Sequence, residues 1–288
     1  MARVLIAGCG YTGIALGELL AREGHAVWGL RRRPELLPST IHAVQANLCG
    51  PQSLTTIPPA LDFIFYTAAA ERSDDASYHA VYVAGMQNLL NHLFATGHKV
   101  KRVFFTSSTA VYGHANGEWV DETSETSPQG FAGLRLLEAE QLLGRGPFAA
   151  TIVRMAGIYG PSRVRLINQV LQGEAVCPSG DPRYTNRIHR DDCAAVLRHL
   201  MGLSSPKAVY LGADNEPADQ SEVFQWLAKR LGRPVPSTEP GADVAAGKPK
   251  SNKRCRNSRL LETGYLFCYP TFREGYEAIL AGMALPST

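Results

Sequence analysis

A glycine-rich segment near the N-terminus is the first group of residues whose types and spacing predict chemistry. Six consecutive residues read Gly-Cys-Gly-Tyr-Thr-Gly. Gly8 permits a tight turn, Gly10 lets the backbone approach a diphosphate, and Gly13 lets the next helix pack close to the preceding strand. Free N–H groups at the start of that helix bind phosphate charge, so Tyr11 and Thr12 are placed in the same site. The alternative is an ordinary tight turn in an α/β domain.

Three consecutive arginines follow the next apolar run and predict which dinucleotide is bound. A site for NAD places Asp or Glu at the end of the second strand, where the carboxylate accepts hydrogen bonds from the ribose. Here Arg31 stands at that place, followed by Arg32 and Arg33. Guanidinium groups suit a 2′-phosphate, so the sequence predicts NADP(H) in preference to NAD(H). The alternative is a solvated turn before Pro34.

The elements that must position these residues can be read from the apolar pattern. Residues 3–7 and 26–30 are short apolar runs fit for buried parallel strands, and a helical pattern from Ile14 to Leu20 lies between them. A strand, glycine turn, helix and strand within about 30 residues is the context in which the glycine pattern indicates dinucleotide binding.

The rest of the chain continues the alternation of strand and helix. Further strands are expected at 43–46, 63–66, 103–106 and 151–154, with helices near 77–96 and 133–143. This alternation predicts an α/β fold with a doubly wound parallel sheet of the Rossmann type. We expect a dinucleotide-binding domain over residues 1–158, rejoined by 187–212, and a smaller substrate-binding lobe from 159–186 and 213–288.

Composition excludes several classes of protein. The chain has 288 residues, of which 45% are hydrophobic, and its 29 Lys and Arg against 26 Asp and Glu give a net charge of +3. This balance argues against nucleic acid or a membrane as partner, and no apolar run reaches the roughly 18 residues of a membrane span. Six scattered cysteines are typical of reduced thiols in a cytoplasmic protein. The histidines show no metal-binding spacing, so no metal site is predicted.

A basic segment near the C-terminus has two interpretations. Residues 248–259 carry six basic residues and no acidic one. The segment could clamp a phosphorylated ligand, but a solvated, mobile loop is the preferred interpretation.

Several later motifs carry a resemblance to a known family. They are Tyr66–Ala69, Phe105–Gly113 (FTSSTAVYG), Arg154–Pro161 (RMAGIYGP), Arg187–Asp192, Ser258–Leu261 and Tyr269–Gly275. Together with the glycine-rich segment, they resemble the extended short-chain dehydrogenase/reductase family of nucleotide-sugar epimerases and dehydratases. The resemblance implies a cofactor site that includes Asn47, Leu48, Ala68, Ala69, Ser107, Ala156, Gly157 and Ile158. It also implies a catalytic serine at Ser108.

The chain departs from the family at the proton-transfer residues. The family uses a Tyr and a Lys four residues later, and the matching positions are Phe131 and Arg135. Phe has no titratable proton, whereas Arg135 could still hold the ribose. Tyr82 stands where the family often has Asn, and its phenol could supply the missing proton or simply pack in the core. Other acids that could act near the nicotinamide are Tyr66, Tyr112, Tyr159 and His114.

Two functions from different classes follow. The first is an NADP-dependent oxidoreductase that acts on a carbonyl, an alcohol or a nucleotide-sugar-like small molecule, with Ser108 polarising the oxygen. The second is a protein that binds NADP without turnover, as a sensor or partner-binding module. Helices 77–96 and 133–143 carry apolar residues on more than one face, and the resemblance implies that such helices pair in a homodimer, unless these residues are buried within one chain.

Overall fold

A parallel β-sheet forms the centre of the computed structural model, which describes residues 1–239 and 251–283. In these ranges the sheet has seven strands in the order β12-β7-β5-β4-β1-β2-β3, and each neighbouring pair is parallel. The strands are β1 (Arg3–Ala7), β2 (Ala26–Arg31), β3 (His42–Gln45), β4 (Phe63–Tyr66), β5 (Arg102–Ser108), β7 (Ala150–Met155) and β12 (Val209–Gly212). The order reverses beside β1, and open sheets of this kind bind ligands outside the carboxyl ends of the strands at such a point. The predicted doubly wound Rossmann fold is confirmed.

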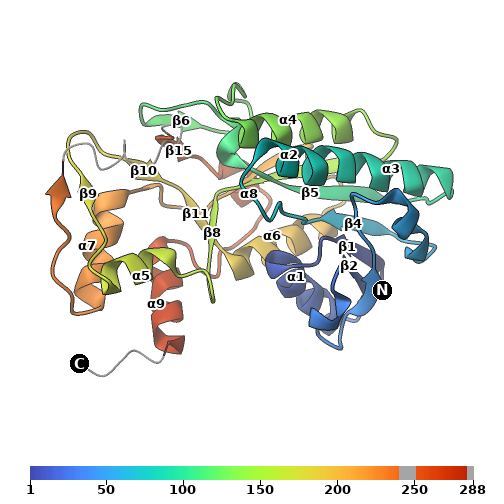
Figure 1. The fold of residues 1–288 in the computed structure, drawn as a ribbon, viewed down its shortest axis with the longest axis horizontal. Helices are drawn as coiled ribbons and strands as arrows, with labels where there is room; N and C mark the ends of the chain where they lie inside the picture. The colour runs from blue at the N-terminus through green and yellow to red at the C-terminus, as the bar shows by residue number, and fades with distance from the viewer. Residues whose placement is uncertain (240–250, 284–288) are drawn as a thin grey trace.

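Helices cover both faces of the sheet because its strands are apolar on both sides. In β1, Leu5 and Ala7 pack into one core cluster, while Val4 and Ile6 pack into the other. Figure 1 shows α3 and α4 above the sheet and α1 and α6 below it. The helices of this part are α1 (Tyr11–Arg22), α2 (Asp75–Tyr78), α3 (Gly85–Ala95), α4 (Phe131–Gly144), α6 (Arg190–Gly202) and α8 (Ser258–Leu261). Short 3-10 turns span Pro34–Leu36, Pro51–Thr56 and Thr109–Val111.

A smaller lobe lies at the left of Figure 1, beside the end of the sheet. Its core is a third apolar cluster that includes Phe224, Phe272 and Tyr276. The lobe contains α5 (Arg165–Leu171), α7 (Gln220–Arg230) and α9 (Phe272–Gly282). Short strand pairs complete it: β8 (Gly157–Tyr159) with β11 (Arg187–His189), β10 (Tyr184–Thr185) with β13 (Ala218–Asp219), and β9 (Cys177–Pro178) with β14 (Thr238–Glu239).

The basic segment near the C-terminus is not the mobile loop that its charge predicts, over the part that the structure describes. Lys253–Cys255 form β15, which pairs with β6 (Glu118–Val120). Lys253 and Cys255 are buried, whereas the Arg254 guanidinium lies 4.9 Å from the centre of the Trp119 ring. Buried and less buried side chains alternate here, as they do in a strand. Because one of the buried residues is Lys253, the sequence lacks the apolar–polar alternation that would predict a strand. Residues 248–250 of the segment lie outside the described residues.

No helix in residues 1–239 and 251–283 is both long and apolar enough to cross a membrane.

Candidate functional site

A cavity of about 580 Å³ lies at the carboxyl ends of the central strands. It brings together residues far apart in the sequence, from the turn after β1 to the end of β7. Fifteen of the predicted site residues line it: Gly8, Gly10, Tyr11, Thr12, Arg31, Arg32, Asn47, Leu48, Ala68, Ala69, Tyr82, Ser107, Ser108, Ala156 and Ile158. Gly13, Arg135 and Gly157 are not among the lining residues. The turn, the arginines and the serines that the sequence selects therefore face one space.

The glycine-rich turn has the shape that its spacing predicts. Gly8 has a φ of +80°, and a Cβ there would lie 2.3 Å from the Ala68 Cα. A Cβ on Gly13 would lie 2.8 Å from the Thr67 hydroxyl oxygen. By contrast, the nearest atom to a Cβ on Gly10 would be 3.8 Å away, so this residue faces open space.

No side chain caps the N-terminus of α1 at Gly10. The first N–H groups of that helix consequently need an acceptor from outside the chain, and the positive end of the helix faces the same space. A dinucleotide diphosphate fits this cradle, because phosphate oxygens would accept those hydrogen bonds.

Arginines gather at the end of the cavity that β2 reaches. Arg31, Arg32, Arg33 and Arg72 all line it. Arg32 pairs with Glu71, the acidic residue at this end of the lining. Within the described ranges, Arg31 and Arg33 form no ion pair. This end of the cavity thus carries an excess of positive charge that suits a phosphate group.

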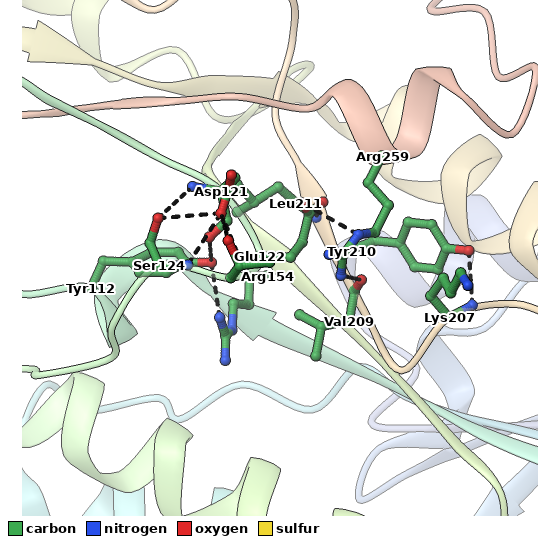
Figure 2. A network of polar contacts seen from close by, with 11 residues as sticks. Tyr112, Asp121, Glu122, Ser124, Arg154, Lys207, Val209, Tyr210, Leu211 and Arg259 are labelled. Atoms are coloured by element: carbon green, nitrogen blue, oxygen red, sulfur yellow. Dashed lines mark hydrogen bonds and ion pairs between the residues drawn. The ribbon is translucent and has the colours of Figure 1, made fainter.

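A buried ion pair fixes the strand end that carries the two serines. The Ser107 hydroxyl donates to the Glu140 carboxylate at 2.6 Å, and Arg154 donates to the same carboxylate from its Nη2 at 2.7 Å. Glu140 and Arg154 are 5% and 6% exposed, so the pair is shielded from water. Figure 2 shows Arg154 donating to the Tyr112 hydroxyl, which in turn donates to the Asp121 carbonyl. Ser107 is held by this network, and the adjacent Ser108 is left facing the cavity.

Ser108 is placed to donate a hydrogen bond into the cavity. Its hydroxyl oxygen accepts from the Ala110 N–H at 3.1 Å, which leaves the hydroxyl proton available. A donor in this position can polarise a carbonyl oxygen of a bound molecule.

Tyr82 lines the same cavity from an irregular helix. The predicted helix over 77–96 is interrupted by a π-helix at His79–Ala84, a form that is frequent at functional sites. The buried Tyr66 hydroxyl donates to the Val81 carbonyl inside this segment. Burial raises the pKa of Tyr82 to about 12, although the Ala70 N–H opposes the rise. The phenol therefore stays protonated at neutral pH, and the raised pKa makes it a weaker acid than a free phenol, so its place in the cavity, not its acidity, makes it a candidate proton donor.

The other acids named from the sequence lie elsewhere. Tyr66, Tyr112, Tyr159 and His114 are not among the residues that line the cavity, whereas Tyr82 is. The Tyr66 and Tyr112 hydroxyls already donate to backbone carbonyls. Geometry thus favours Tyr82 over these four as a proton donor at this site.

Phe131 and Arg135 occupy the first two turns of α4. The Phe131 ring packs edge-on against Tyr78 at 5.3 Å, and Tyr78 in turn contacts Tyr82. Arg135 makes a bidentate contact with Asp75, at 2.8 and 2.9 Å, and a third with Glu138 at 2.8 Å. These carboxylates raise the pKa of Arg135 and compete for the guanidinium that the sequence predicts to hold a ribose.

A second cavity, of about 930 Å³, lies in the smaller lobe, where residues between 157 and 187 line it together with Gln220 and Tyr276. Four arginines line it: Arg163, Arg165, Arg183 and Arg187. Arg187 is 5% exposed, and its Nη1 has no hydrogen-bond partner within the described residues. A buried guanidinium with an unused donor suits an anionic ligand group.

Several lining residues carry no motif that predicts them from the sequence. Arg72 and Arg163 line the first cavity, and Arg163 lines the second as well. Arg163 lies two residues after the RMAGIYGP motif, which could have suggested that it is near the site. Only the folded chain shows that it lines both cavities. His189 caps α6, since its Nδ1 accepts from the Asp191 N–H at 3.2 Å. In the residues described, no group of three or more His, Cys, Asp and Glu side chains is arranged to hold a metal.

A known family shares this arrangement. The sequence profile described as "NAD dependent epimerase/dehydratase family" matches residues 4–212, which include the glycine-rich turn, both serines and Tyr82. The chain belongs to that family. The resemblance drawn from the motifs is confirmed.

Three similar proteins each align with almost the whole chain. A structure from Methylobacillus flagellatus, described as an NAD-dependent epimerase/dehydratase, is 36% identical with a TM-score of 0.80, covering 98% of both chains. The Escherichia coli K12 protein YeeZ is 28% identical over 94% of this chain and 97% of its own. Human epimerase family protein SDR39U1, solved with NADPH, is 20% identical, with a TM-score of 0.80 over 98% of this chain and 100% of that one. At that identity the likeness shows the fold alone.

Proposed function

We propose that the protein is an NADP-dependent oxidoreductase of the extended short-chain type. The observation that carries the proposal is that Arg31, Arg32 and Arg33 line the same cavity as the glycine-rich turn. A 2′-phosphate would bind there: Arg32 pairs with Glu71, whereas Arg31 and Arg33 form no ion pair within the described residues. Proteins of this fold are found with NAD and with NADPH. The choice between the two therefore rests on these side chains.

Different residues of the chain contact different parts of the cofactor in this proposal. The turn from Gly8 to Gly13 binds the diphosphate, and Asn47, Leu48, Ala68 and Ala69 lie along the cofactor. Ala156 and Ile158 enclose the nicotinamide end, whereas Gly157, which the resemblance also implies, does not line this cavity. When bound, the nicotinamide carries the hydride.

Two hydroxyls act on the substrate in this proposal. Ser108 donates a hydrogen bond to the carbonyl or alcohol oxygen, and Tyr82 supplies the proton that the family's usual Tyr would supply. Both line the cavity. Ser107 lies alongside as a cofactor contact, and Arg135 would reach the ribose only by leaving Asp75.

The substrate side of the proposal is supported by the second cavity. Its arginines favour a small molecule with an anionic group, and a nucleotide-sugar-like compound has one. Neither nucleic acid nor a membrane is needed to explain the charge of this cavity.

Consumption of NADPH tests the enzyme directly. Purified protein and NADPH are mixed with a panel of aldehydes, ketones and nucleotide sugars, and absorbance at the nicotinamide band is followed. We expect turnover with at least one compound, and a loss of about 10²-fold or more in Ser108→Ala with NADPH affinity unchanged. NADPH oxidation that is equally fast in Ser108→Ala would contradict the assignment of Ser108.

A second function, an NADP-binding sensor without turnover, is favoured by α4. Phe131 cannot transfer a proton, and Arg135 is occupied by Asp75 and Glu138. In this case NADPH would bind with no consumption across the whole panel, which separates the two functions.

The dimer and the division of the chain are further proposals. Leu89 and Leu93 of α3 and Leu136 of α4 are buried within one chain. Phe94 is 69% exposed beside a groove between α3 and α4, and we propose that a second copy covers it. We also propose the domain boundaries given above and a cytoplasmic location. Analytical ultracentrifugation of Phe94→Glu, expected to be monomeric, tests the dimer.

A further inference from the structure

The segment after β8 reaches from the smaller lobe to the glycine-rich turn. The Tyr11 hydroxyl donates to the Pro161 carbonyl at 2.7 Å. Gly160 allows this approach, because a Cβ there would lie 2.8 Å from the Tyr11 hydroxyl oxygen. The φ of Ser162 is +66°, a conformation that residues with side chains adopt at some cost. The backbone of this segment is therefore fixed against the start of α1.

Arg163 follows directly and lies over the Tyr11 ring. Its guanidinium carbon is 4.2 Å from the ring centre. Arg190 lies over the same ring at 5.2 Å, but its guanidinium is paired with Asp191 at 2.8 Å. Within residues 1–239 and 251–283, the side chain of Arg163 has neither an ion pair nor a hydrogen bond. Of the two cations on Tyr11, Arg163 is the one whose charge is available to a ligand.

Arg163 also stands at the junction of the two cavities. Arg163 and Ile158 line both, whereas Arg31 and Arg32 line only the first, and Arg165 and Arg187 only the second. A guanidinium has donors on more than one edge, so it can contact two anions while its face stays on an aromatic ring.

We propose that Arg163 is a binding residue shared by the two sites. On one side it contacts the diphosphate held at the start of α1, and on the other the anionic group of the second ligand. The first contact rests on the proposed function, since it requires a nicotinamide nucleotide in the first cavity. The second requires only an anion in the arginine-lined cavity. Arg163 thereby contributes to the affinity for both the nicotinamide nucleotide and the second ligand.

Isothermal titration calorimetry with three matched variants tests the first contact. Arg163→Gln, Arg165→Gln and Arg190→Gln each remove one charge near the junction. We expect the Kd for NADPH to rise about tenfold in Arg163→Gln and to stay within about twofold in the other two. Because Arg163 is exposed, the variant should fold, and circular dichroism checks this.

The second contact is tested on protein saturated with NADPH, with inorganic pyrophosphate as the probe. We expect Arg163→Gln and Arg165→Gln to weaken pyrophosphate binding about tenfold, and Arg190→Gln to leave it unchanged. An absence of pyrophosphate binding, or binding that Arg163→Gln does not weaken, overturns the shared role. If NADPH binds the unmodified protein and Arg163→Gln equally well, this inference fails while the proposed function stands. If NADPH binds neither the unmodified protein nor Arg163→Gln, both this inference and the proposed function fail.

Discussion

The buried pair of Glu140 and Arg154 gives the sharpest test of how the strand end is held. Glu140→Gln keeps the size of the side chain but removes its charge and replaces one of its two acceptor oxygens with an NH2 donor. Burial alone would lower the pKa of Arg154, yet the hydrogen bonds and charge of Glu140 raise it overall. Without that charge, the guanidinium, 6% exposed, is left uncompensated. Breaking a buried pair in this way costs about 3–5 kcal/mol.

The same helix supplies the control. Glu138 pairs with Arg135 at 2.8 Å, but its side chain is 43% exposed and that of Arg135 is 31% exposed. Exposed pairs contribute about 0–1 kcal/mol, so Glu138→Gln should change the free energy of unfolding little. Urea unfolding followed by circular dichroism measures both variants. If Glu140→Gln destabilises the protein no more than Glu138→Gln does, the network does not hold the strand end as described.

Three further predictions concern single side chains. Gly8→Ala should lower the melting temperature more than Gly24→Ala: their φ values are +80° and +82°, but only at Gly8 would the new Cβ meet other atoms, those of Ala68. Equal shifts in calorimetry would count against the tight approach. Burial raises the pKa of Asp214 to about 8, so the folded protein keeps a proton that the unfolded chain releases near pH 4. This group consequently lowers stability as pH rises from about 4 to 8, by about 1.4 kcal/mol per unit. Urea unfolding at pH 5.5 and 7.5 should show a smaller difference for Asp214→Asn than for the unmodified protein, and an identical difference would refute this. Tyr82→Phe should reduce turnover about 10²–10⁴-fold with unchanged NADPH affinity, and full activity would exclude Tyr82 as proton donor.

The sheet and the glycine-rich turn could be predicted from the sequence because local patterns determine them. Strand β1, the turn at Gly8 and helix α1 follow from apolar runs and glycine spacing within a few residues of each other. The place of Ser108 at a strand end follows in the same way. Such features need no knowledge of distant contacts.

Features that depend on distant residues could not be predicted. The π-helix at His79–Ala84 contains the carbonyl that accepts from Tyr66, fifteen residues before it. Arg135 is engaged by Asp75, sixty residues away. Arg163 meets Tyr11 only because the smaller lobe folds back over α1. Each contact is made by tertiary packing, which leaves no periodic signal in the sequence.

The central claim is that the first cavity binds a nicotinamide nucleotide and that arginines select its 2′-phosphate. Calorimetric titration of NADPH and NADH tests it most directly, with Arg31→Asp and, as a control, Arg22→Asp at the exposed end of α1. We predict that NADPH binds at least about tenfold more tightly than NADH, that Arg31→Asp abolishes or reverses this preference, and that Arg22→Asp does not. Tighter binding of NADH to the unmodified protein, or binding of neither nucleotide, would contradict the account.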